Sequence, residues 1–190
     1  MIFIHGSEYD RATASREAQV LCEKFLDANG MHHPTFRFVH GKNVNLYGRY
    51  YPGSETVDVY VNRCRLPTTS NYSWSWPGYT ADVTVLGVTA HEVGHHVENV
   101  KGWRTVINDM YDIVVKERGV SGYAAMDRHE DFSEAMKLMI TNPSLLEAIC
   151  PRRHGYFTQT LGLVPVEARH WTEILCDSPR HLQAVRSKIR

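Results

Sequence analysis

The stretch of this chain best suited to chemistry is TAHEVGHHVE, residues 89–98, which contains the pattern H-E-x-x-H. His91 and His95 are four residues apart, so on a helix both imidazoles project from one face and can bind one metal ion. Glu92, next to the first histidine, is placed to act as a base. A catalytic zinc site has three protein ligands and one position for water. The pattern therefore predicts a zinc site only if another part of the chain supplies a third ligand.

The sequence after this pattern indicates where the third ligand lies. Metzincin-type proteases continue with glycine and then histidine at positions that Glu98 and Lys101 occupy here, so that class is excluded. The alternative is a carboxylate from a later helix. The stretch HEDFSEAM, residues 129–136, offers Glu130 and Glu134 one helical turn apart, beside an apolar face. We expect Glu130 to bind the metal and Glu134 to accept the ring N–H of a ligand histidine, which fixes the tautomer of that ring.

Several neighbouring histidines and acids are weaker candidates, because acidic side chains on a helix usually face solvent. Three carry suitable ligand atoms and are kept as substitutes: Glu98, His129 and Asp131. Three are assigned no role, either as mere neighbours or because their spacing does not fit a ligand: His96, His154 and His170.

The sequence YAAMDRHEDFSEAM, which starts at Tyr123 and follows HEVGH, resembles the lethal-factor-type zinc metallopeptidases. In that family a tyrosine precedes the glutamate ligand by seven residues, as Tyr123 precedes Glu130 here. The resemblance covers residues 89–139 and implies a zincin-like fold and endopeptidase activity with one Zn²⁺ per chain. It implies that His91, His95 and Glu130 are the ligands, that Glu92 is the general base and that Tyr123 stabilises the oxyanion. No carrier domain or substrate-specificity loop of that family is recognisable, so the substrate is left open.

The chemistry expected of such a site is hydrolysis of a peptide bond. A zinc ion with two histidines and one glutamate lowers the pKa of a bound water toward neutrality. Glu92 can take the proton of that water and pass it to the leaving amine, while Tyr123 donates its O–H to the developing oxyanion. The expected partner is a protein or peptide substrate. Trp74 and Trp76, in the loop before the active-site helix, either border the cleft or cover an edge of the core.

The elements that must position these residues are predicted from hydrophobic periodicity and turn signals. Residues 81–99 also resemble a buried strand, but their apolar stripe has helical spacing. Helices are expected over 8–28, 81–99, 103–117, 127–141, 144–149, 166–176 and 179–189, and strands over 34–40, 46–51 and 56–64. The result is a single α+β zinc metallopeptidase domain, residues 1–190, with a small N-terminal mixed sheet, an active-site helix and a mainly helical C-terminal part.

Composition limits the other possibilities. The 190 residues include 21 basic and 21 acidic side chains, which gives no basic field for nucleic acid. Since no apolar run is long enough for a signal peptide or a membrane span, we expect a cytoplasmic protein with no membrane partner. The four cysteines form no C-x-x-C pair, so buried thiols are expected, with one disulfide left open. The oligomeric state is not predicted.

Two other functions fit the same residues. One is a cytosolic regulatory metalloprotease that cleaves a single repressor-like partner and ignores most peptides. The other is a non-catalytic zinc-binding interaction module, which requires a closed site with four protein ligands. The base expected at Glu92 argues against the module, since a structural site has no use for it.

Overall fold

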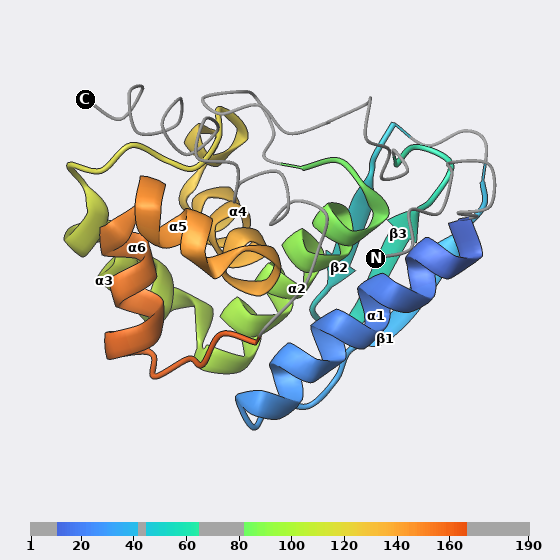
Figure 1. Cartoon of the computed structure of the whole chain (residues 1–190), viewed down its shortest axis with the longest axis horizontal. Coiled ribbons are helices and arrows are strands. Elements are labelled where there is room, and N and C mark those ends of the chain that lie inside the picture. The colour runs from blue at the N-terminus through green and yellow to red at the C-terminus, as the bar shows by residue number, and fades with distance from the viewer. Residues whose placement is uncertain (1–10, 42–44, 65–81, 167–190) are drawn as a thin grey trace, which may run out of the picture.

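The computed structural model describes residues 11–41, 45–64 and 82–166. Its helix α2 lies between two groups of elements, with α1 and the sheet on one side and the later helices on the other (Figure 1). The N-terminal elements are α1 (Arg11–Ala28), β1 (Thr35–Val39), β2 (Gly48–Tyr51) and β3 (Thr56–Tyr60). Next come α2 (Val85–Lys101), α3 (Trp103–Val114), η1 (Tyr123–Ala125), α4 (Arg128–Thr141), α5 (Pro143–Ile149), α6 (Pro151–Gly155) and η2 (Tyr156–Thr160).

The described strands form one mixed sheet in the order β1-β3-β2, which confirms the expected small mixed sheet. β3 runs parallel to β1 and antiparallel to β2. Val57 and Val59 of β3 point toward α1 and α2 and belong to the same buried cluster as residues of those helices. Asp58, between them, faces the other way and binds the guanidinium of Arg37 at 2.6 and 2.8 Å. One face of the sheet is therefore apolar and covered, and all three strands are shorter than the sequence predicts.

Helix α2 begins at Val85, so its predicted start at residue 81 is wrong. Thr84 has extended backbone angles, φ −71° and ψ 166°, and its hydroxyl accepts the backbone N–H of Gly87. The backbone N–H of Thr84 in turn donates to the Asp82 carboxylate. A threonine whose side chain bonds the first turn stops a helix from extending further back. Val83 therefore lies outside the helix, although we expected it in the apolar stripe.

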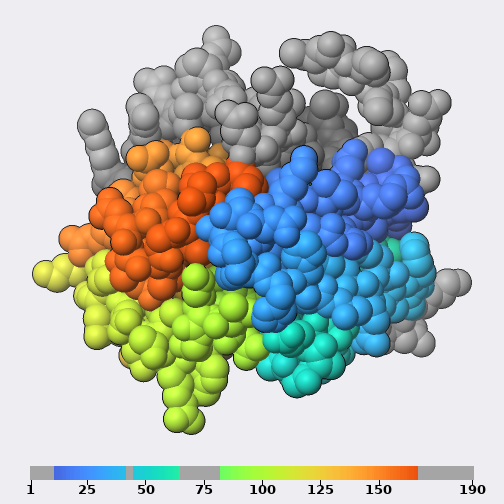
Figure 2. Space-filling view, turned by 90° about the horizontal axis from the view of Figure 1, so that it is seen from below, coloured from blue at the N-terminus to red at the C-terminus, as the bar shows by residue number. Residues whose placement is uncertain are grey.

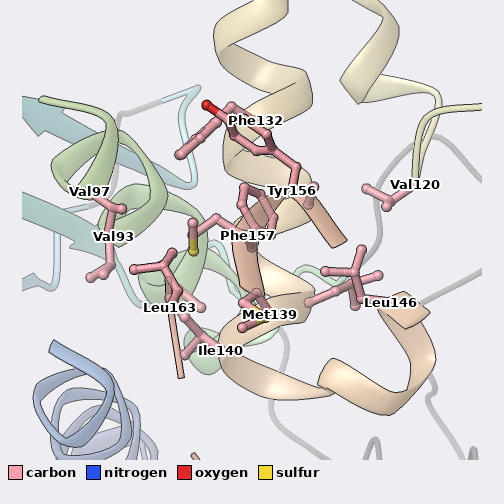
Figure 3. Packing of buried hydrophobic residues seen from close by; sticks show 14 of the residues in the cluster. Val93, Val97, Val120, Phe132, Met139, Ile140, Leu146, Tyr156, Phe157 and Leu163 are labelled. Carbon is pink, nitrogen blue, oxygen red and sulfur yellow. The ribbon is translucent and has the colours of Figure 1, made fainter. Parts of the chain in front are cut away.

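Helix α4 is the second central element. All its residues from Asp131 to Thr141 are buried, and it begins with the Asp127 side chain accepting the N–H groups of His129 and Glu130. Its Phe132 contacts Phe157 ring to ring, with centroids 5.2 Å apart (Figure 3). Figure 3 also shows Val93 and Val97 of α2 on one side of this core. The helical C-terminal part is thus confirmed for the described residues.

Two predictions for this part differ from the structure. The helix expected over 103–117 ends at Val114. The helical segment of residues 151–160, which comprises α6 and the π-helix η2, was not predicted. The helices expected over 166–176 and 179–189 lie outside the described residues apart from Val166, which has no regular structure. None of the described helices is both long and apolar enough to cross a membrane.

The end of α1 contacts the C-terminal end of the described chain. The Asn29 side chain, just after α1, donates to the carbonyl of Val164 at 3.0 Å and accepts the N–H of the same residue at 2.7 Å. Figure 2 shows this junction, where the blue N-terminal chain lies against the orange chain that precedes Val166. The thiols of three cysteines are free and buried: Cys22, Cys64 and Cys150. Cys176 lies outside the described residues.

Candidate metal centre

The structure brings His91, His95 and Glu130 together at the crossing of α2 and α4, and we call these three residues the ligand group. The Glu130 Oε2 atom lies 3.0 Å from Nε2 of His91 and 3.7 Å from Nε2 of His95. One donor atom from each of the three residues lies within 4.8 Å of the other two. Ligands about 2.0–2.1 Å from a tetrahedral zinc are separated by about 3.3 Å. The three predicted ligands therefore lie close enough together to bind one zinc ion.

The same three residues also have the charge of a metal site and a carboxylate oxygen that is available to bind an ion. Glu130 Oε2 is buried and, apart from its ion pair with His91, has no hydrogen-bond partner among the described residues. Burial lowers the pKa of His91, but its contacts with the carboxylates of Glu130 and Glu134 more than offset this and raise the pKa to about 9. The site thus favours a positive charge between these groups. A divalent cation would supply that charge and bind Glu130 Oε2, so these residues fit zinc.

The imidazole of His91 is held from behind by Glu134, as predicted. Its Nδ1 donates to Glu134 Oε1 at 2.8 Å, which leaves Nε2 facing Glu130. The same carboxylate accepts the Ser121 hydroxyl at 2.7 Å and contacts the ammonium of Lys137. Burial raises the pKa of Glu134, yet the Lys137 charge and the His91 hydrogen bond together bring it far below its usual range. Glu134 is therefore an anion that fixes the His91 tautomer.

A second group of side chains holds His95. Its Nδ1 lies 2.9 Å from the hydroxyl of Ser133 and 3.6 Å from Oε2 of Glu98. The other oxygen of Glu98 contacts Nδ1 of His129. Glu98 and His129, considered as substitute ligands, therefore lie behind the ligand group and outside it. Asp131 is not a ligand either, because it pairs with the guanidinium of Arg153.

Glu92 lies beside the ligands and is buried. It accepts the backbone N–H of Tyr50, a residue of β2. Burial raises the pKa of its carboxyl, against the lowering effect of His91 and His95. β2 can run this close because residue 48 is glycine: a Cβ there would lie 2.6 Å from Glu92 Oε1.

Tyr123 lies in the short helix η1 and faces the ligand group. Its ring centroid is 5.8 Å from that of His91, and its hydroxyl hydrogen-bonds the Glu130 carboxylate. Burial and, next, the charge of Glu130 raise the pKa of the Tyr123 hydroxyl. The phenol therefore stays protonated near neutral pH and can donate a hydrogen bond into the site.

The ligand group opens into a cavity of about 670 Å³. Its walls come from β2 and the segment before it, from α2, from Trp103 and from the η1–α4 region. β2 is an edge strand among the described strands, and exposed apolar side chains of Leu46 and Trp103 border the opening. Trp74 and Trp76, considered for the same cleft, lie outside the described residues.

Sequence reasoning missed three residues that support this centre: Gly48, Ser133 and Lys137. Lys137 stands one turn after Glu134 and Ser133 one turn after Glu130, so helical spacing could have suggested both. Gly48 had no such signal, since its role depends on the approach of a distant strand.

Comparisons of the chain with protein-family models, with curated proteins and with solved structures give no match. The chemistry of the site is therefore argued from its own side chains.

Proposed function

We propose that this chain is a zinc-dependent endopeptidase of the lethal-factor type. His91, His95 and Glu130 would hold the metal, and Glu92 and Tyr123 would act on the substrate. The observation that carries the proposal is the position of Glu130 Oε2, which is buried 3.0 and 3.7 Å from two imidazole nitrogens. Such an arrangement beside a base and an open cavity is what metal-assisted hydrolysis needs.

A zinc ion bound there would supply Lewis-acid chemistry, polarising a peptide carbonyl and bringing the pKa of a bound water toward neutrality. Glu92 takes a proton from the attacking water and later delivers it to the leaving amine. Its burial raises the pKa of its carboxyl, which makes it a better base than an exposed glutamate. Tyr123 turns its O–H from Glu130 to the oxyanion of the tetrahedral state and stabilises it.

The proposed substrate is a protein or peptide in extended form. The cavity is bordered by β2, whose outer edge is unpaired among the described strands. An extended peptide can hydrogen-bond to such an edge, and its scissile carbonyl then faces the ligand group. The exposed Leu46 and Trp103 at the rim favour apolar side chains next to the cleaved bond.

A non-catalytic zinc module is less well supported than an enzyme. A structural site needs four protein ligands, whereas the ligand group among the described residues has three and borders a cavity. A protease dedicated to one folded partner uses the same ligands and the same base, so substrate range has to separate it from a general endopeptidase.

The test is cleavage of a peptide library by the zinc-loaded protein, read by mass spectrometry. Wild type, Glu92→Gln and Glu130→Gln are compared, with bound zinc measured in each. We expect cleavage by wild type alone, full zinc in Glu92→Gln and weak zinc binding in Glu130→Gln. Zinc held at full affinity by Glu130→Gln would refute the ligand assignment, and equal cleavage by Glu92→Gln would refute the role of the base. Tight zinc without any cleavage would favour the dedicated protease or the module.

A further inference from the structure

A second cluster of potential ligands lies on a different face of α2. His96 follows His95 directly, yet its ring points toward the segment between α1 and β1 and toward the turn between β2 and β3. There it meets His32 from the first segment and Glu55 from the second. In Figure 2 these two segments, blue and teal, lie next to each other on the visible face. Three parts of the chain that are distant in sequence thus supply two imidazoles and one carboxylate to one place.

The distances within this cluster are those of a ligand set. Nε2 of His32 lies 2.9 Å from Glu55 Oε2. One donor atom from each of His32, Glu55 and His96 lies within 4.8 Å of the other two. Nε2 of His96 is also 2.9 Å from the backbone carbonyl oxygen of His32, which is a further oxygen donor beside the cluster. Neighbouring ligands of a zinc ion are about 3.3 Å apart, so small movements of the exposed His32 and Glu55 are enough to surround an ion.

We propose that His32, Glu55 and His96 form a second site for a divalent cation of the zinc type. It is separate from the candidate metal centre and does not depend on the proposed peptidase activity. Two imidazoles and one carboxylate are a donor set that occurs in protein zinc sites. The site lies where α2 meets the segment before β1 and the turn between β2 and β3, so a bound cation would link these three parts of the chain.

Metal binding at this site requires one proton to move. Nε2 of His96 carries the proton that it donates to the His32 carbonyl, and Nδ1 lies 3.2 Å from the hydroxyl of Tyr50. When a cation takes the Nε2 lone pair, that proton leaves and Nδ1 carries the ring proton instead, donating it to the Tyr50 oxygen. That oxygen accepts a hydrogen bond from Asn99 as well. The partner needed to hold a metal-bound imidazole from behind is therefore already present.

The backbone conformation of Glu55 is a further observation in favour of a binding site at this cluster. Glu55 has φ 47° and is the one non-glycine residue with positive φ in the described part of the chain. This conformation is unfavourable for a residue with a Cβ, and here it accompanies a carboxylate directed at His32. The His32–Glu55 ion pair is exposed and gains little by itself, so it does not explain the strained turn.

The experiment counts Zn²⁺ bound per chain in four forms of the protein and one control variant, by titration calorimetry and native mass spectrometry. These are wild type, His32→Gln, Glu130→Gln and the double variant. His33→Gln is the matched control, because His33 is the adjacent exposed histidine and pairs with Asp27 instead. We expect wild type and the control to bind one more Zn²⁺ than either single variant and two more than the double variant. Zinc affinity at the lost site should fall at least a hundredfold.

The outcomes separate the second site from the proposed peptidase centre. Loss of one Zn²⁺ in Glu130→Gln together with no change in His32→Gln overturns the second site and leaves the first intact. Loss in His32→Gln alone supports the second site and counts against the first. Equal loss in His33→Gln, or binding at this cluster only in the millimolar range, overturns the second site as nonspecific. His32 is exposed, so its substitution leaves the fold intact, which unchanged circular dichroism of the zinc-free variant verifies.

Discussion

Gly94, inside the H-E-x-x-H pattern, allows α2 and α4 to approach each other, and its replacement by alanine should separate them. A Cβ on residue 94 would lie 2.8 Å from Cα of Ser133 and 3.1 Å from the Ser133 carbonyl oxygen. Carbon atoms in contact are about 3.5–4.0 Å apart, so the overlap is close to 1 Å. The clash is with backbone, which no side-chain rotation can relieve. Gly94→Ala must therefore move one helix relative to the other.

The expected cost follows from two opposing effects. Overfilling a packed core costs about 1–3 kcal/mol. Alanine in place of glycine inside a helix returns about 0.5–1 kcal/mol. We therefore expect Gly94→Ala to lower the free energy of unfolding by about 1–2 kcal/mol, visible in urea as a lower midpoint with an unchanged slope. Ser133, which holds His95 through a 2.9 Å contact, moves with α4, so zinc affinity should fall about tenfold.

Gly155→Ala is the control for this prediction. Gly155 ends α6 with helical angles, φ −60° and ψ −39°, and the nearest atom to an added Cβ is 4.0 Å away. Alanine fits there, so this variant should be about 0.4–1 kcal/mol more stable than wild type. A Gly94→Ala protein as stable as wild type, or as stable as the control, would refute the close-approach argument.

Three further predictions concern the fold. Arg153→Met should lower the free energy of unfolding, measured in urea, by about 3–5 kcal/mol, because it leaves the buried Asp131 carboxylate without its cation. A variant whose stability is within about 1 kcal/mol of wild type would contradict this. Phe132→Ala should cost about 3–5 kcal/mol in the same assay, since the ring is fully buried against Phe157. Burial raises the pKa of the Cys64 and Cys150 thiols to about 12 each, and that of Cys22 is raised as well. Peptide mapping after iodoacetamide treatment at pH 8 should find these three thiols unmodified in the native protein and modified in urea. Rapid labelling of any of the three in the native protein would disprove the burial of that cysteine.

The two central helices and the ligand group were predictable because their signals are local. In α2, spacing of three and four residues separates the apolar Val93 and Val97 from the ligand histidines. The position of Glu134 behind His91 also followed from one helical turn. The start of α2 was missed because the β-branched run around Val83 has the composition of either helix or strand. The Thr84 cap that decides between them is a single hydrogen bond.

Other parts of the site depend on contacts that no local pattern contains. His96 has the spacing of a mere neighbour, yet it bonds the carbonyl of a residue 64 positions earlier. Lys137 has the appearance of a solvated helix charge, but packing of α4 on every side leaves its side chain only 3% exposed. A sequence pattern indicates which face of a helix is apolar, and it cannot indicate that a polar face is buried as well. The helices expected after residue 166 stay predictions.

The charge balance around α2 and α4 is the strongest physical support for a bound cation. Glu92, Glu98 and Glu134 are all buried, and Glu130 Oε2 is buried with them. Lys137 neutralises Glu134. Glu92, Glu98 and Glu130 have only neutral or titratable partners, the Tyr50 N–H, His129 and His91, and several buried anions this close together favour a proton or a cation between them. Against the lowering effect of burial, the nearby carboxylates raise the pKa of His91 to about 9, and burial raises the pKa of Glu92, so both groups are shifted toward their protonated forms. A divalent cation at Glu130 would take the place of these protons, because His91 would bind it through a free lone pair and its charge would favour ionised Glu92. The ion that we propose for the ligand group would thereby also favour the state in which Glu92 can act as a base.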